Sequence, residues 1–357
     1  MPPAATVPAV TPPATRYAIL VLPSANRVYA DAATGLLMAE LAIFSGAVLG
    51  GALSDVAVTP VAGLDHVTFT APRLSDEQAA YVANLSAVYA LYAVEGELLR
   101  PVPLRRLDRY DSDLLTIQKY PGKTNEQFTK LLLNVTVAAS ASAREMLTRR
   151  LVVLDPLCGR GTTLNQALMY GWDALGVDTD TKDVEAYAQF VERWLKDKRL
   201  KHHVEHGPVR RNKQVVARRL TATLAATKDD HRAGAVQRLD VVNTDTTRTV
   251  EFLGSGCADV VVTDLPYGVQ HGSRTTGRGL ARSPLDLLAD AAPVWVKALR
   301  AGGALGISWN THVARRADAV RVLADAGLDV LDEGPWLGLR HRVDQAIMRD
   351  VVVARKA

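Results

Sequence analysis

The sequence is poor in cysteine and in aromatic side chains. Its 357 residues include two cysteines, and Phe, Trp and Tyr make up 6% of the chain. Two cysteines, Cys158 and Cys257, are too few for a disulfide framework, which predicts a reducing, cytoplasmic setting. No Cys-x-x-Cys or other paired ligand spacing is present, so His202, His203 and His206 do not predict a metal site.

Long uncharged apolar runs are also lacking. The longest apolar stretch, residues 35–53, contains Glu40 and several glycines, and it predicts a buried helix followed by a turn rather than a membrane span. The first residues show no charged-then-apolar signal pattern. Residues 1–15 are rich in Pro, Ala and Thr, which predicts a disordered leader. We expect neither secretion nor membrane insertion.

What is present is an ordinary globular composition, with 48% hydrophobic and 22% charged residues. The length exceeds what one core usually supports, so two domains are expected. Residues 16–100 predict a small α+β, ferredoxin-like domain, an RNA-binding accessory, and the proline-containing segment 101–122 predicts a linker. Its expected elements are strands at 17–22 and 56–70, and helices at 36–48 and at 76–94, the latter capped by Ser75.

Residues 123–357 alternate apolar strands with amphipathic helices. This alternation predicts a Rossmann-like, doubly wound and mostly parallel α/β sheet, which binds ligands at the carboxyl ends of its strands. The expected strands are 151–154, 174–177, 260–263 and 304–309, with two more near Leu328 and Ile347, and the expected helices are 162–170, 182–195, 284–299 and 314–326.

A glycine turn follows the first of these strands. Gly159 and Gly161 come directly after the strand that ends at Asp155, and the absence of a Cβ lets the main chain approach a ligand closely. Asp178 ends the next strand, where a carboxylate can accept hydrogen bonds from both hydroxyls of a ribose. The spacing is not G-x-G-x-x-G, which disfavours a dehydrogenase, but a tight turn without a nucleotide remains an alternative.

A polar and aromatic corner follows the strand at 260–263. An exocyclic base amine is a poor nucleophile, because its lone pair is delocalised into the ring, so it must be held in line with a methyl donor. The Asp264 carboxylate and the Leu265 carbonyl can accept its N–H groups, Pro266 stiffens the turn, and Tyr267 offers a face for a flipped base. The alternative is that Asp264 caps a turn and Tyr267 is packing.

Three passages, at residues 120–134, 155–162 and 264–268, together resemble the THUMP-associated tRNA guanosine-N2 methyltransferases and their bacterial relatives. These are class I, Rossmann-like enzymes that use S-adenosylmethionine. Relatives commonly have Asp-Pro-Pro-Tyr where this chain has Leu265 in place of the first proline. The resemblance implies that the cofactor contacts Phe128, Thr129, Asp155, Cys158, Gly159, Gly161, Thr162, Asp178, Asp245 and Asp264, and that the target amine meets Asp264, Leu265, Pro266 and Tyr267.

A basic segment lies between these motifs. Residues 196–232 hold eleven Lys and Arg against four Asp and Glu, a local balance of +7, whereas the whole chain has +4. We expect this basic insertion, 196–235, to bind a nucleic acid, most simply tRNA. The alternative is a solvated helix face.

The sequence therefore predicts methylation of a nucleobase amine, with guanosine N2 in tRNA as the leading target. Adenine N6 in DNA or rRNA is the nearest alternative, and an RNA-binding protein with a vestigial cofactor fold is an alternative of another class. Four later residues, Trp309, Asn310, Trp336 and Arg340, could line the base pocket, but packing or surface roles are favoured for them.

Overall fold

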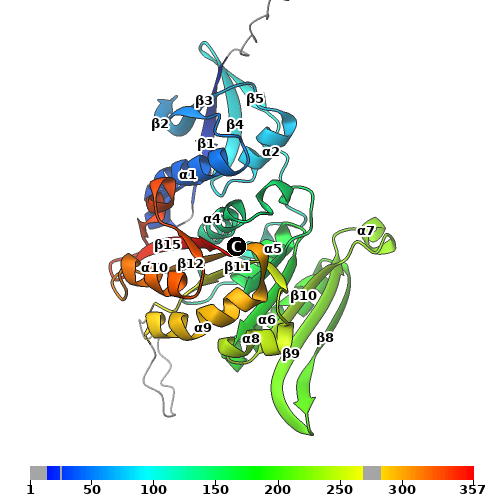
Figure 1. Ribbon diagram of the computed structural model, residues 1–357. Coiled ribbons are helices and arrows are strands. Elements are labelled where there is room, and N and C mark those ends of the chain that lie inside the picture. The colour runs from blue at the N-terminus through cyan, green and yellow to red at the C-terminus, as the bar shows by residue number, and fades with distance from the viewer. Residues whose placement is uncertain (1–13, 25, 268–282) are drawn as a thin grey trace, which may run out of the picture.

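The computed structural model describes residues 14–24, 26–267 and 283–357, and these form two β-sheets with helices between and around them (Figure 1). The expected leader therefore lies almost wholly outside the described residues, and Thr15 already belongs to the first strand.

The first sheet is antiparallel, with the strand order β2-β3-β1-β4-β5. Its first six elements follow the βαββαβ succession and strand order of a ferredoxin-like unit, as expected, and β5 extends the sheet beside β4. In chain order the elements are β1 (Thr15–Val21), α1 (Arg27–Ala47), β2 (Ser54–Val61), β3 (Leu64–Ala71), α2 (Asp76–Ala83), β4 (Val88–Glu95) and β5 (Leu98–Val102).

Two expectations in this unit were wrong. The helix that Ser75 caps ends at Ala83, and residues 88–95 form β4 instead, because β1 offers a partner strand and a short apolar run fits either periodicity. The stretch at 56–70 is a hairpin of two strands, since Ala62 and Gly63 turn the chain with φ of +50° and +80°. The expected helix at 36–48 begins earlier, at Arg27, where the Asn26 side chain caps it.

The segment expected as a linker follows the surface of the second unit. It begins inside β5 and contains the short helix α3 (Asp113–Thr116). The amide of Arg109 donates to the Met169 carbonyl at 2.8 Å, and the Trp194 indole donates to Asp113 at 3.0 Å. The connection is therefore fixed to the second unit at both places.

The second sheet has ten strands and confirms the expected Rossmann-like architecture. Five parallel strands lie in the order β12-β11-β6-β7-β10, β15 and β13 extend one edge antiparallel, and β9 and β8 extend the other. The elements are α4 (Glu126–Ala139), η1 (Ala143–Glu145), β6 (Val152–Asp155), α5 (Thr162–Met169), β7 (Asp173–Asp178), α6 (Thr181–Asp197), β8 (Lys201–Arg211), β9 (Gln214–Ala225), α7 (Lys228–Arg232), β10 (Gln237–Asn243), η2 (Thr246–Arg248), α8 (Thr249–Leu253), β11 (Ala258–Asp264), α9 (Pro284–Ala298), β12 (Leu299–Asn310), α10 (Arg316–Asp325), β13 (Asp329–Leu331), η3 (Gly334–Leu339), β14 (His341–Arg342) and β15 (Met348–Arg355).

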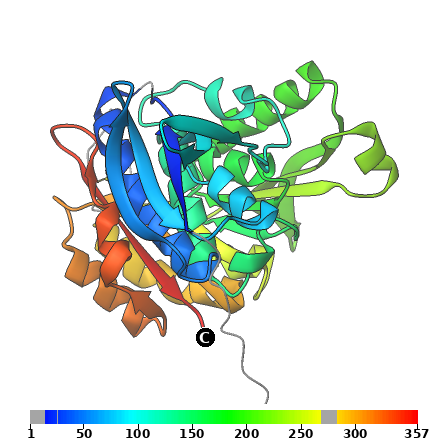
Figure 2. The same cartoon turned by 90° about the horizontal axis from the view of Figure 1, so that it is seen from above.

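Two apolar cores hold the sheet. One contains α4, α5 and α6 and runs on into the first unit, while the other contains α9 and α10 on the opposite face. Helix α1 packs against β3 of the first sheet and also against α4 and η3, so it belongs to both units (Figures 1 and 2). By length and composition α1 could cross a membrane, but 56% of its apolar window is buried inside the protein.

Candidate active site

The glycine turn lies at the carboxyl end of β6, as the sequence predicts. Gly159 has a φ of +48°, and the space where a Cβ would stand is open. Gly161 has a φ of +80°, and a Cβ there would lie 2.2 Å from the Tyr187 ring of α6. Gly159 thus leaves room for a ligand, whereas a side chain at position 161 would collide with α6, and the ligand contact of Gly161 stays a prediction.

Asp155 joins this turn to the strand that carries the acidic corner. Its carboxylate is 4% exposed and accepts hydrogen bonds from the Leu157 amide at 3.1 Å and from the Thr263 hydroxyl at 2.9 Å. Burial raises the pKa of Asp155 to about 7. Because Thr263 directly precedes Asp264, the hydrogen bond sets the glycine turn and the corner side by side.

Asp178 braces the turn from the neighbouring strand. One carboxylate oxygen accepts from the Gly159 amide at 2.7 Å and the other from the Asp180 amide at 2.8 Å. Burial raises its pKa. Each oxygen keeps a second lone pair for a further donor. Asp245 lies two residues beyond β10, whose last residue, Asn243, is in register with Asp178.

One cavity of about 310 Å³ connects the glycine turn with the acidic corner. Most of the predicted site residues line it, but Gly161, Asp178 and Asp245 do not. The predicted residues on its wall are Phe128, Thr129, Asp155, Cys158, Gly159, Thr162, Asp264, Leu265, Pro266 and Tyr267, and Tyr120, Thr124 and Asp183 are among the lining residues that were not predicted.

The Asp264 carboxylate is surrounded by donors. The Tyr267 hydroxyl lies 2.6 and 2.5 Å from its two oxygens, Thr124 donates at 2.9 Å, and the Ser308 hydroxyl donates to Oδ1. The guanidinium of Arg349 forms an ion pair with it at 3.5 Å. A carboxylate offers about four lone-pair positions, so these donors occupy all of them.

Arg349 is a partner of Asp264 that no sequence pattern predicted. It lies on β15, is 3% exposed, donates to the Tyr267 hydroxyl at 2.7 Å, and stacks over the Phe128 ring at 4.1 Å. Arginine on a strand 85 residues after Asp264 carries no local signal. Only the pairing of β15 with β12 brings it behind the corner.

The later aromatic and polar residues do not line this cavity. Trp309 is 1% exposed in the opposite core, with its indole bound to the Ala314 carbonyl, and Asn310 donates to the Ala346 carbonyl. Trp336 packs at the edge of the other core, and Arg340 is exposed. Within the described ranges, no group of three or more His, Cys, Asp or Glu side chains could hold a metal ion.

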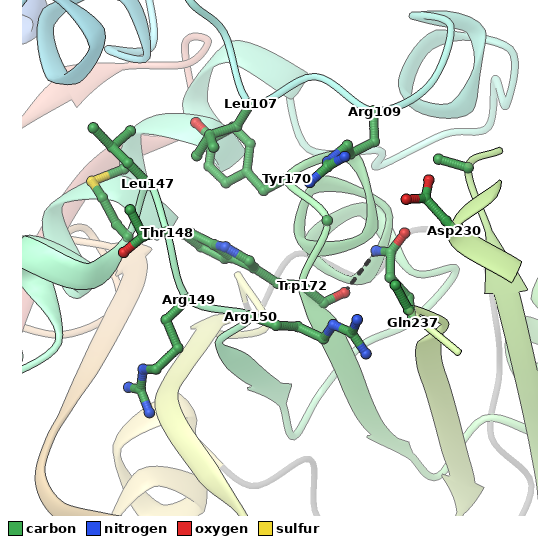
Figure 3. Close-up of a pocket in the computed structure, with 14 residues that line it drawn as sticks. Leu107, Arg109, Leu147, Thr148, Arg149, Arg150, Tyr170, Trp172, Asp230 and Gln237 are labelled. Atoms are coloured by element: carbon green, nitrogen blue, oxygen red, sulfur yellow. Dashed lines mark hydrogen bonds between the residues drawn. The ribbon is translucent and has the colours of Figure 1, made fainter. Parts of the chain in front are cut away.

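A smaller cavity, of about 180 Å³, lies at the opposite, amino end of the strands (Figure 3). Arg149 and Arg150 enter it just before β6, Arg109 comes from the linker, and Gln237 donates to the Trp172 carbonyl at 2.9 Å. None of the predicted site residues lines it. Ligands of such sheets bind at the carboxyl ends, so we assign the chemistry to the larger cavity.

Residues 126–292 match the model of the UPF0020 family, described as RMKL-like, methyltransferase domain. The chain is an S-adenosylmethionine-dependent methyltransferase. No curated protein matches it.

Solved structures resemble the methyltransferase weakly. One is a methyltransferase from Pyrococcus furiosus, with a TM-score of 0.38 and 11% identity, covering 67% of this chain and 88% of that one. Another is a precorrin-6y C5,15-methyltransferase from Geobacter metallireducens GS-15, with a TM-score of 0.36 and 10% identity, covering 67% of this chain and 93% of that one. A TehB-like methyltransferase from Corynebacterium glutamicum has a TM-score of 0.34 at 18% identity, covering 60% and 84%. Likenesses at this level carry no argument about the substrate.

Proposed function

We propose that this methyltransferase methylates an exocyclic amino group of a nucleobase, and that its target is guanosine N2 in tRNA. One observation carries the proposal. The Asp264-Leu265-Pro266-Tyr267 corner and the glycine turn at Gly159 face a single cavity, so an amine held at the corner lies beside the cofactor turn.

The residues present fit S-adenosylmethionine. When bound, it supplies an electrophilic methyl group on a sulfonium sulfur. The open face of Gly159 would accommodate its methionine half, and Phe128, Thr129, Cys158 and Thr162 would surround it. The ribose is given to Asp178 and the adenine to Asp245, because the two residues follow adjacent strands. We assign these roles as part of the proposal.

The acceptor amine must displace a donor from Asp264, because every lone pair of that carboxylate is engaged. We assign the Tyr267 hydroxyl as the donor that leaves, since Thr124, Ser308 and Arg349 hold the carboxylate from other elements. Turning Tyr267 outward frees its ring to stack on the base. With the cofactor bound, its methyl group would be available to an amine held in this way, and Asp264 would orient the amine and take its proton.

Leu265 makes a contact that the proline of the relatives could not. Its amide donates to the Ser308 carbonyl at 2.8 Å, and its side chain is buried in the opposite core. A proline has no N–H to donate. The corner is therefore held to β12 in this chain by a main-chain hydrogen bond.

The hairpin of β8 and β9 is the proposed nucleic-acid surface. Asn243, the last residue of β10, pairs with Arg218, so the rest of the hairpin extends past the carboxyl edge of the sheet, where the active site lies. At about 3.4 Å per residue, the tip projects on the order of 13 Å beyond that edge. The tip carries Arg210 and Lys213, both exposed.

Methylation of purified nucleic acids tests the proposal. The enzyme is incubated with labelled S-adenosylmethionine and, in separate reactions, with tRNA, rRNA and DNA, and the digests are analysed by nucleoside mass spectrometry. We expect N2-methylguanosine in tRNA. N6-methyladenine in DNA or rRNA would favour the alternative target, and label in no nucleic acid would refute the proposal.

The role of Asp264 is tested with the variant Asp264→Asn, which keeps the size of the side chain. We expect it to lower kcat on the order of 10²–10³-fold, the usual effect of losing one preorganised polar contact. S-adenosylhomocysteine should bind within a few-fold of the wild-type affinity. An active Asp264→Asn enzyme would remove the role given to Asp264.

A further inference from the structure

A second cavity, of about 580 Å³, adjoins the active site on the side of the first unit. Thr124 lines both cavities and donates to Asp264, and Arg349, which pairs with Asp264, lines the second. Tyr29 of α1 and Asn26, which caps that helix, form part of its wall. The two cavities therefore share Thr124, which donates to the Asp264 carboxylate, and the first unit contributes directly to the second cavity.

His341 lines this cavity and is 5% exposed. Its Nδ1 lies 3.1 Å from the Leu339 carbonyl, which can only accept, so Nδ1 carries the proton. Burial lowers the pKa of His341 to about 4, so the ring is neutral and Nε2 is an acceptor. This Nε2 is buried and has no hydrogen-bond partner among the described residues. A buried unpaired acceptor is costly, and a ligand that donates one hydrogen bond would satisfy it.

His341 stands close to the acceptor carboxylate through two ring contacts. The His341 and Phe128 rings are 5.0 Å apart between centroids, and Arg349 stacks on the same Phe128 ring while it pairs with Asp264. A ligand that contacts both Asp264 and His341 therefore has to span the stacked Arg349 and Phe128 side chains that connect them.

The charge of the cavity fits a phosphorylated ligand. Lys123 pairs with Glu126, and Arg349 pairs with Asp264. Lys119 and Arg342 form no ion pair with any side chain that the structure describes. Two cations at one cavity, without an ion-pair partner among the described side chains, favour an anion such as a nucleotide phosphate.

We propose that this second cavity binds the acceptor nucleotide, with His341 Nε2 accepting one of its N–H or O–H groups and with Lys119 and Arg342 facing its phosphate. This assignment rests on the proposed function, since it takes the acceptor to be a nucleotide. In this assignment, residues of α1 and β14 contribute to substrate recognition, in addition to the glycine turn and the acidic corner.

The test is a titration of the wild-type enzyme, saturated with sinefungin, with GMP, 2′-deoxy-GMP and AMP. The ¹⁵N resonance of His341 Nε2 reports whether that atom accepts a hydrogen bond. We expect GMP to shift it. If 2′-deoxy-GMP does not, the donor is the ribose hydroxyl, and if both do, the donor is on the base. An unmoved resonance at saturating GMP and AMP would overturn the assignment of His341.

Variants add a second measurement with the nucleic acid that the enzyme methylates. We expect His341→Phe to raise KM about tenfold with sinefungin affinity unchanged, and His341→Gln, which restores an acceptor, to recover most of that loss. Lys119→Ala should also raise KM, whereas Lys297→Ala, at an exposed lysine of α9, should not. If the wild type methylates a nucleic acid and none of the cavity variants changes KM, this inference fails while the proposed function stands.

Discussion

At the scale of single residues, the ion pair of Asp264 and Arg349 means that a mutation at the acidic corner changes stability as well as activity. Arg349 is 3% exposed, and removing one partner of such a pair leaves a buried charge without compensation. Loss of activity in an Asp264 variant can then come from damaged packing rather than lost chemistry. The variants have to separate these two effects.

We expect Asp264→Ala to lower the free energy of unfolding by about 3 kcal/mol, because Arg349 stays buried and charged. Adding Arg349→Met should restore much of this stability, since no buried charge is left, but should not restore methyl transfer. Urea denaturation of the two single variants and the double variant gives the coupling between the residues. Strictly additive effects would show that the pair does not interact.

At the scale of elements, short sequence patterns predicted the helix and turns that they mark. Where such a pattern was missing, the structure was decided by which strands pair with each other. The sequence predicted a capped helix from Ser75, the glycine turn from Asp155 and Gly159, and the acidic corner from the apolar run before Asp264. Residues 88–95 gave no such signal, because their apolar pattern suits a helix or a strand until β1 pairs with them. Arg349 was unpredictable for the same reason, since β15 reaches the corner only through β12.

The β8–β9 hairpin gives a prediction at this scale. Of its charges, Arg211 pairs with Glu251 and Arg219 with Asp240, so the basic run offers fewer unpaired cations than its composition suggests. Arg210 and Lys213 form no ion pair within the described part of the chain, which makes them the better sites to test.

We expect Arg210→Glu combined with Lys213→Glu to weaken binding of the nucleic acid and to lower its salt dependence. Each lost phosphate contact should reduce the slope of log K against log salt by about 0.7–0.9. Filter binding at several salt concentrations measures this slope, with Lys297→Glu on α9 as the matched control. An unchanged slope in the hairpin variant would place the polymer elsewhere.

At the scale of the whole molecule, the two units share a buried polar network. Glu40 of α1 is fully buried and accepts hydrogen bonds from the Ser86 amide and hydroxyl and from Asn134 of α4 at 2.7 Å. Tyr170 donates to the same Asn134 at 2.9 Å. One apolar core also runs through both units, so they should unfold together.

Burial raises the pKa of Glu40 to about 7, above its ordinary value. The folded protein therefore binds a proton more tightly than the unfolded chain, and the resulting stability is complete below about pH 4.5 and is lost as the pH rises to about 7. Such a pKa difference corresponds to roughly 3 kcal/mol. Asp155, with its pKa of about 7, acts in the same direction.

We expect Glu40→Gln, which resembles the protonated form, to remove the Glu40 part of this pH dependence. Urea denaturation between pH 5 and 8 should show that the wild type loses stability with rising pH more steeply than the variant. Parallel curves would mean that Glu40 keeps its ordinary acidity. The reversed slope would mean that its charged form is favoured in the folded state.

The ion pair behind the corner also has a consequence for biosynthesis. Translation delivers Asp264 85 residues before Arg349, so a nascent chain that has already formed β11 holds the acid without its counter-ion. Until β15 inserts beside β12, Tyr267 has no arginine to fix its hydroxyl. The acceptor site is therefore complete only after β15 has paired with β12 at that edge of the sheet.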